Sequence, residues 1–269
     1  MRIHYNANNA WLHSLNQLLN PPVGTQYYEK SKPREMLTRE IIGSSVAFQM
    51  VLPVVTCKDR GLSYRFMAAE ALWVLQGSND LNFHPQIQQK LNPYSDNGVT
   101  MSGAYGPMVM QQIRFVCETL HSDIDSRQAV MTIWKPNPSA SKDIPCTIGL
   151  QFMIREGTIH CMACMRSSDV WMGLPYDMFT FSCIANRIRL AISPILKLGT
   201  LTIFRGSSHL YKSNFEDADK VRATYNPDEN RVLGEMKTVA DMINWLHFVG
   251  GSETETFARE RILNCPEWV

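Results

Sequence analysis

Two neighbouring runs of strand-forming residues place the tightest limit on how this chain can fold. Residues 147–154 and 158–165 are rich in apolar and β-branched side chains, and only Arg155-Glu156-Gly157 lies between them. So short a connection, ending in glycine, is typical of a turn between antiparallel strands. The sequence therefore predicts a β-hairpin around which a larger sheet is built.

The rest of the chain alternates between helical and extended patterns. Apolar spacing and stop signals predict helices at residues 8–20, 64–76, 107–120, 174–190 and 238–247. Further strands are predicted at residues 41–53, 129–134, 198–204 and 209–211, and loops at residues 22–40 and 91–106. No internal repeat or low-complexity run interrupts the pattern, so we expect an α+β fold in a single domain, residues 1–269.

Composition excludes several classes of protein. Apolar residues make up 45% and charged residues 19% of the 269 residues, which argues against disorder, and a net charge of +1 argues against a nucleic-acid-coating surface. The apolar runs are too short to cross a bilayer, and the first residues lack the apolar core of a signal peptide. We expect a cytoplasmic protein without membrane or nucleic-acid partners, whose seven cysteines are mostly buried thiols.

One cysteine stands where a nucleophile would be placed. Cys146 follows a polar loop at the start of a predicted strand, and the hairpin leads from it to Arg166-Ser167-Ser168-Asp169. A nearby arginine would favour a thiolate and could also hold a phosphate. From composition alone, the same residues also fit a packing cysteine and a solvated turn.

Other polar residues have a functional and a structural interpretation. Glu70 lies in an apolar helix, so it either faces water or is a site acid with a raised pKa. Asp177 follows the tight turn at Gly173 and either acts in a site or favours the start of a helix. His209 and Tyr211 alternate on one strand face, so both can point at one ligand. Cys161 and Cys164 would point to opposite strand faces, so no metal site is expected.

Together these motifs resemble the thymidylate synthases and their relatives, the pyrimidine nucleotide hydroxymethylases, over about residues 35–215. The resemblance rests on the order and spacing of Glu70-Ala-Leu-Trp-Val-Leu-Gln-Gly, Gly103-Ala-Tyr-Gly, Asp125-Ser-Arg127, Asp143-Ile-Pro-Cys146-Thr, Gln151-Phe, Arg166-Ser-Ser-Asp169-Val, Gly173-Leu-Pro-Tyr-Asp177 and Ser208-His-Leu-Tyr211. It implies a large mixed sheet packed by helices, with one sheet face forming a homodimer interface. Within the family, the chain is most similar to (deoxy)cytidylate 5-hydroxymethyltransferases.

The resemblance also implies a reaction. Cys146 would add to carbon 6 of a pyrimidine nucleoside monophosphate, which makes carbon 5 nucleophilic enough to take a methylene group from 5,10-methylenetetrahydrofolate. Water would then complete a hydroxymethyl group, or hydride from the folate a methyl group. Glu70 would handle protons near the base, and Tyr105 would lie near Cys146.

Binding roles follow from the same resemblance. Arg166 and Ser167 would bind the phosphate, with Ser168, Gly173 and Arg34 as further substrate-binding candidates, and Arg127 would reach the phosphate site of the neighbouring subunit. His209 and Tyr211 would hold the sugar hydroxyl, which suits ribose or deoxyribose. Asp169 would approach the pterin, and the C-terminal carboxylate of Val269 would close over the folate.

Three departures from the synthase pattern bear on the substrate and product. Asp177 stands where thymidylate synthases have an asparagine that pairs with uracil, and a carboxyl group suits the amino group and N3 of cytosine. Residues 91–98 lack the tryptophans of the synthases, which favours water over hydride, although Tyr94 could supply a wall. Gln128 replaces a second arginine.

The sequence therefore predicts folate-dependent 5-hydroxymethylation of a cytidine monophosphate, in its deoxy form. The enzyme alternatives are C5 methylation of dCMP and conversion of dUMP to dTMP. A non-catalytic nucleotide- or RNA-binding relative and a structural dimer protein are the alternatives from other classes. Synthesis of modified DNA in a virus, in the host cytoplasm, and a nucleoside antibiotic pathway are both compatible settings.

Overall fold

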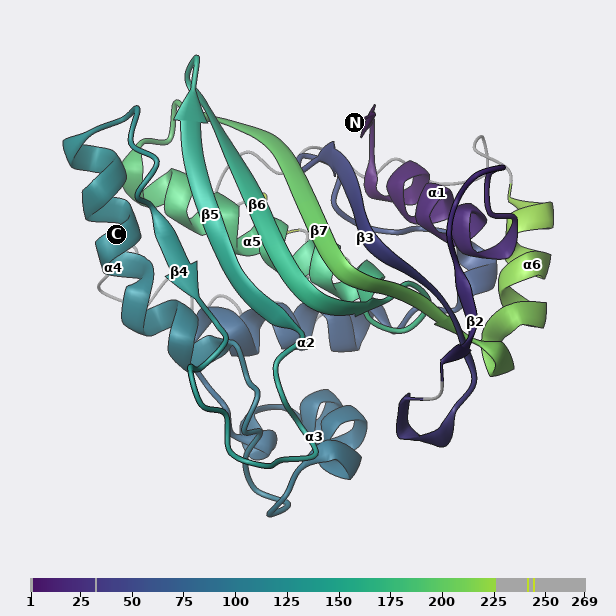
Figure 1. Ribbon diagram of the computed structural model, residues 1–269. Coiled ribbons are helices and arrows are strands. Elements are labelled where there is room, and N and C mark those ends of the chain that lie inside the picture. Colours follow the sequence, from purple (N-terminus) through teal and green to yellow (C-terminus); the bar gives the residue numbers. More distant parts are fainter. Residues whose placement is uncertain (1, 32, 226–240, 242–243, 245–269) are drawn as a thin grey trace.

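The computed structural model describes residues 2–31 and 33–225, together with residues 241 and 244 (Figure 1). Its α-helices are α1 (Ala7–Leu19), α2 (Tyr64–Leu75), α3 (Pro85–Leu91), α4 (Gly106–Ser122), α5 (Leu174–Ile192) and α6 (Phe215–Thr224). Its strands are β1 (Ile3–His4), β2 (Tyr28–Ser31), β3 (Thr38–Gln49), β4 (Val130–Thr132), β5 (Thr147–Arg155), β6 (Thr158–Asp169) and β7 (Lys197–Tyr211).

Within the described residues, the strands form one seven-stranded sheet. Its order is β1-β3-β7-β6-β5-β4, and β2 pairs with β3. Strands β3 and β7, β5 and β6, and β4 and β5 pair antiparallel, whereas β6 and β7 run parallel, as do β1 and β3. The predicted α+β fold with a large mixed sheet packed by helices is therefore confirmed.

The predicted hairpin forms between β5 and β6. The two strands pair from Arg155 and Thr158 at the turn to Thr147 and Met165 at the far end. Only Glu156 and Gly157 form the connection, and both have positive φ angles, 50° and 69°. Positive φ at both central residues twists the turn to match the strands, which is why a glycine is favoured here.

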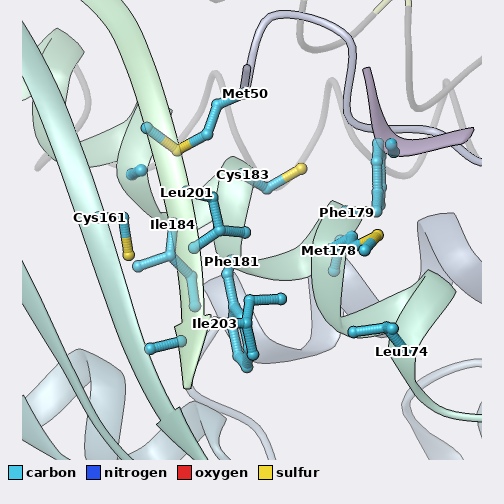
Figure 2. Close-up of a cluster of buried hydrophobic side chains, with 14 of the residues drawn as sticks. Met50, Cys161, Leu174, Met178, Phe179, Phe181, Cys183, Ile184, Leu201 and Ile203 are labelled. Atoms are coloured by element: carbon cyan, nitrogen blue, oxygen red, sulfur yellow. The ribbon is translucent and has the colours of Figure 1, made fainter. Parts of the chain in front are cut away.

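Helix α5 connects the parallel strands β6 and β7, and with α2 it lies behind the sheet in Figure 1. Its side chains Phe181 and Ile184 pack against Cys161 of β6 and against Leu201 and Ile203 of β7, and all five are fully buried (Figure 2). This apolar contact fixes α5 against the strands. The first turn of α5 and the carboxyl ends of β6 and β7 consequently lie at the same end of the sheet.

The other face of the sheet carries no helix among the described residues (Figure 1). Ile42, Ile148 and Phe204 are 62%, 44% and 45% exposed, and Cys164 is exposed while Cys161 is buried. The prediction that the two cysteines point to opposite strand faces is thus confirmed.

Several local predictions need correction. The segment 22–40 is not all loop, because β2 and the start of β3 pair there through backbone hydrogen bonds that turn-forming residues do not exclude. The segment 91–106 contains a short 3-10 helix, Asn92–Tyr94, and the extended segments 198–204 and 209–211 belong to one strand, β7. Most of the helix predicted at 238–247 lies outside the described residues, so the single-domain prediction stays a prediction.

Candidate active site

A cavity of about 140 Å³ lies between α2, α5 and two loops. Its wall consists of Glu70, Trp73 and Val74 from α2, Asp177 and Thr180 from α5, Leu91 from the end of α3, and Met101, Gly103, Ala104, Tyr105 and Asp143 from the connecting segments. Three carboxyl groups and a phenol thus face one mostly apolar space. Such a combination is typical of a site that binds a small ligand.

Glu70 and Asp177 reach this cavity from different helices. Loss of solvent raises the pKa of Glu70 from 4.5 to about 7. Burial, followed by the nearby charge of Glu70, raises the pKa of Asp177 well above its ordinary value. The cavity therefore favours the protonated form of Asp177, which can donate a hydrogen bond.

The structure bears on both interpretations of Glu70 and Asp177. Glu70 lines a cavity instead of projecting from a solvated helix face. Asp177 lines the same cavity, and it also lies in the first turn of α5, where an acidic side chain favours the start of a helix.

Thr180 and Trp73 belong to the cavity wall but escaped the sequence analysis. Each lies three residues after a carboxylate, Asp177 or Glu70, and residues at this spacing share a helix face. The Thr180 side chain is only 3% exposed, and no group among the described residues hydrogen-bonds to its hydroxyl. Tyr94, predicted as a possible wall, is instead 44% exposed and absent from the cavity lining.

Tyr105 lies between the cavity and Cys146. It immediately precedes α4, and its ring stacks on Phe181 with centroids 6.4 Å apart. Burial raises the pKa of Tyr105 well above its ordinary value, and the nearby Asp177 and Cys146 add to this effect. Tyr105 is therefore a neutral phenol close to both groups, available to donate a hydrogen bond.

Cys146 and Arg166, which the hairpin connects in sequence, lie close together in the structure. The guanidinium Nη2 lies 3.8 Å from Cys146 Sγ. The same side chain donates to the carbonyls of Pro145 and Ile144, each at 2.9 Å. Cys146 is partly exposed and lies beside the cavity wall, not within it. A guanidinium next to a sulfur favours a thiolate, so the arrangement suits a nucleophile.

Several further predicted polar residues gather at the carboxyl ends of β6 and β7. Residues 166–169 are the last four residues of β6, not a solvated turn. Asp169 pairs with His209 across the strands, and Ser167 Oγ lies 3.5 Å from His209 Nδ1. The rings of His209 and Tyr211 meet edge to face at 5.4 Å, so they share one strand face as predicted.

Asp169 and Arg60 form a second polar group beside this edge. Asp169 Oδ1 accepts from the backbone amides of Trp171 and Met172, both at 2.9 Å, and burial raises the pKa of its carboxyl group. Arg60 donates to the Trp171 carbonyl at 2.6 Å and stacks over the Trp171 ring at 4.2 Å. Nothing in the sequence pattern around Arg60 had indicated this position.

Two predicted residues, Arg127 and Ser168, do not join the group around Cys146 in this chain. The Arg127 residue is exposed, and its backbone carbonyl accepts a hydrogen bond from the Gln151 side chain. Gln151 follows Cys146 by five residues, which corresponds to about 16 Å in an extended strand. Ser168 is buried on the strand face opposite Ser167. The backbone of Arg34 belongs to a 3-10 helix, Pro33–Glu35. The Arg34 side chain and Val269 lie outside the described part of the chain, so their predicted roles stay predictions.

The part of the chain that the structure describes lacks two features. None of the helices there is both long enough and apolar enough to cross a bilayer. No set of three or more His, Cys, Asp or Glu side chains converges there in a way that could hold a metal ion.

Comparison with known proteins defines the family. The sequence model of the family described as thymidylate synthase matches residues 19–231, which is most of the chain and includes every part of the cavity. The chain therefore belongs to the thymidylate synthase family. It is also 26% identical, over 236 residues, to the deoxyuridylate hydroxymethyltransferase of Bacillus phage SP01. That match covers 78% of this chain but only 61% of the phage protein, so the chain spans less than two thirds of its relative's length.

Proposed function

We propose that this protein transfers a one-carbon unit from 5,10-methylenetetrahydrofolate to carbon 5 of a pyrimidine nucleoside monophosphate. The proposed substrate is dCMP and the proposed product is its 5-hydroxymethyl derivative. Membership of the thymidylate synthase family supports the reaction class. The observation that carries the choice of base is Asp177, a buried carboxyl group with a raised pKa that lines the cavity together with Glu70.

Cys146 is the proposed nucleophile. Its thiolate, favoured by Arg166 at 3.8 Å, adds to carbon 6 of the ring, and carbon 5 then bonds to the methylene carbon of the folate. Carbon 5 loses its proton and the folate nitrogen leaves, so an exocyclic methylene remains. Addition of water to this methylene and departure of the thiolate complete the reaction. Glu70, with its pKa of about 7, can accept or return a proton at neutral pH.

The hydrogen-bonding capacity of Asp177 supports cytosine as the base. A neutral carboxyl group donates through its hydroxyl to N3 and accepts from the 4-amino group through its carbonyl oxygen. Both partners would be satisfied inside the cavity, where an unpaired polar group costs roughly 1–3 kcal/mol. The Thr180 hydroxyl, without a partner among the described residues, lies one helical turn further along the same wall.

Uracil is the second candidate base. A neutral carboxyl group can also direct its hydroxyl toward a 4-oxo group and accept from N3–H. The phage relative carries the name deoxyuridylate hydroxymethyltransferase. Hydroxymethylation of dUMP, methylation of dCMP and conversion of dUMP to dTMP are therefore the competing outcomes.

Product mass separates these outcomes. The protein is incubated with methylenetetrahydrofolate and, in turn, dCMP, CMP, dUMP and UMP. We expect dCMP to gain CH2O, whereas methylation would add CH2 and oxidise the folate to dihydrofolate. Addition of CH2O to dUMP alone would identify dUMP as the substrate in place of dCMP. No turnover of any of the four nucleotides by folded protein would refute the proposed reaction.

Substitution of Asp177→Asn tests the base contact. An amide also has one donor and one acceptor, but unlike a carboxyl group it cannot transfer a proton to N3, so we expect kcat/KM to move toward uracil by about 10- to 100-fold relative to cytosine. The measurement is the ratio of kcat/KM for dCMP and dUMP in both proteins. Unchanged cytosine preference in the variant would remove Asp177 from base recognition.

Water as the terminal nucleophile is supported by the cavity wall. Asp143 and Glu70 are polar, and residues 91–98 contribute Leu91 but no tryptophan to the lining. Trp73 of α2 is the indole in the wall. A polar wall can hold a water molecule near the reacting carbon, which favours hydroxymethyl over methyl.

The uncovered sheet face supports a homodimer. Ile42, Ile148 and Phe204 expose large apolar side chains there, a pattern that marks protein interfaces. In such a dimer, Arg127 would complete the phosphate site of the partner. We expect light scattering to give a dimer, and Phe204→Asp to give a monomer.

Subunit mixing tests the role of Arg127. Cys146→Ala and Arg127→Ala are each expected to be nearly inactive. Mixed dimers of the two contain one site with both Cys146 and Arg127, so activity should return on mixing. Absence of recovery in verified mixed dimers would place Arg127 outside the partner's site.

A further inference from the structure

Two aspartates hold together the loops that frame the cavity. The first loop, residues 95–105, carries Gly103 and Tyr105, and the second, residues 135–146, ends at Cys146. Asp143 Oδ2 accepts from the Gly103 amide at 2.7 Å. Asp96 Oδ1 accepts from the Lys142 amide at 3.0 Å. Each loop therefore supplies a carboxylate that binds a backbone amide of the other.

Ser141 joins these two bonds into one network. Its hydroxyl donates to Asp96 Oδ2 at 2.5 Å and lies 3.1 Å from the Asp143 carbonyl. The Asp143 amide in turn donates to Ser141 Oγ at 3.0 Å. Ser102 Oγ adds a contact of 3.3 Å to Asp96 Oδ2. The hydrogen bonds from Lys142 and Ser141 also hold the pKa of Asp96 below its ordinary value.

The packing at Gly103 shows how closely the loops approach. A Cβ atom on Gly103 would lie 2.8 Å from the Asp143 carbonyl oxygen and 2.9 Å from Asp143 Oδ1. Real Cβ atoms do not approach backbone that closely, so only glycine allows the loops to meet here. This requirement comes from the close approach and not from an unusual backbone angle.

We infer that Asp143 and Asp96 are positioning residues, which fix the nucleophile loop against the Tyr105 loop and so set where Cys146 stands relative to the cavity. This inference rests on the proposed function for its effect on turnover. Asp143 is three residues from Cys146, and Tyr105 is two residues from Gly103. A displacement of about 1 Å between a nucleophile and its target can cost about 100-fold in rate.

The first test uses a matched pair of substitutions in one loop. Ser141→Ala removes the hydroxyl that links both aspartates, whereas Ser139→Ala changes an exposed residue two positions away. We expect Ser141→Ala to speed hydrogen exchange of the Gly103 and Lys142 amides about tenfold and to change the alkylation rate of Cys146 by iodoacetamide, followed on its peptide by mass spectrometry. Equal behaviour of the two variants would overturn the inference.

Two substitutions of Asp143 distinguish the effect of its hydrogen bond from the effect of its negative charge. Asp143→Ala removes the acceptor for the Gly103 amide, and we expect kcat to fall roughly 10- to 100-fold with little change in KM for the nucleotide. Asp143→Asn keeps an acceptor oxygen and should restore most of kcat. Equal loss in both variants would show that the negative charge acts directly, which contradicts a positioning role.

The substitution Gly103→Ala tests the same contact between the loops from the side of the first loop. The added methyl group should force the loops apart and reproduce the exchange and alkylation changes of Ser141→Ala. Because neither measurement involves a nucleotide, both decide the inference even if the nucleotide panel shows no turnover. Wild-type exchange rates in Gly103→Ala would overturn it.

Discussion

Substitution of Glu70→Gln should make the protein more stable and less active. Removal from water raises the pKa of the Glu70 carboxyl group from 4.5 to about 7. A rise of this size corresponds to about 3 kcal/mol of unfavourable free energy for the ionised group in the folded state. Glutamine has a similar shape and no charge, so it avoids this cost.

The sign of the effect gives it a distinct pH dependence. Between the unfolded pKa near 4.5 and the folded pKa of about 7, the unfolded chain releases a proton that the folded protein keeps. Wild-type stability therefore falls as pH rises through this range and levels off above it. The advantage of Glu70→Gln should be about 1 kcal/mol at about pH 5 and about 3 kcal/mol at about pH 8.

Urea unfolding of both proteins at these two pH values measures the difference. Glu118→Gln is the matched control, because Glu118 is 61% exposed and pairs with Arg114 on the surface of α4, where such pairs contribute about 0–1 kcal/mol. A pH-independent difference for Glu70→Gln, or lower stability at about pH 8, would refute the reasoning. Loss of turnover in the stabilised variant would mark Glu70 as a residue kept for function at a cost in stability.

Two further substitutions test buried polar groups. Burial lowers the pKa of Arg205 to about 10, and its guanidinium has no hydrogen-bond partner among the described residues. Arg205→Met should therefore stabilise the protein by about 3 kcal/mol and raise Tm by roughly 5–10 °C in thermal unfolding. A lower Tm would contradict this. Thr180→Val should raise KM for the nucleotide about 3- to 10-fold while leaving Tm nearly unchanged, because the hydroxyl lines the cavity and has no hydrogen-bond partner among the described residues. An unchanged KM in steady-state assays would remove Thr180 from substrate binding.

Local patterns in the sequence determined much of the fold. The strand–turn–strand pattern around Glu156 and Gly157 predicts the β5–β6 hairpin, because the turn conformation depends on the residues within it. Helix α2 begins at Tyr64 and ends one residue before its predicted end. The placement of Glu70 in an apolar helix and of Cys146 before a strand likewise followed from neighbouring residues alone.

Only the tertiary structure decided which distant groups meet. Glu70 and Asp177 face one cavity because α2 and α5 pack behind the same sheet, and their shared burial raises both pKa values. The bonds from Asp143 to Gly103 and from Asp96 to Lys142 join separate loops, so no periodicity could indicate them. Spacing along the chain encodes the elements, whereas contacts across the chain depend on how those elements pack.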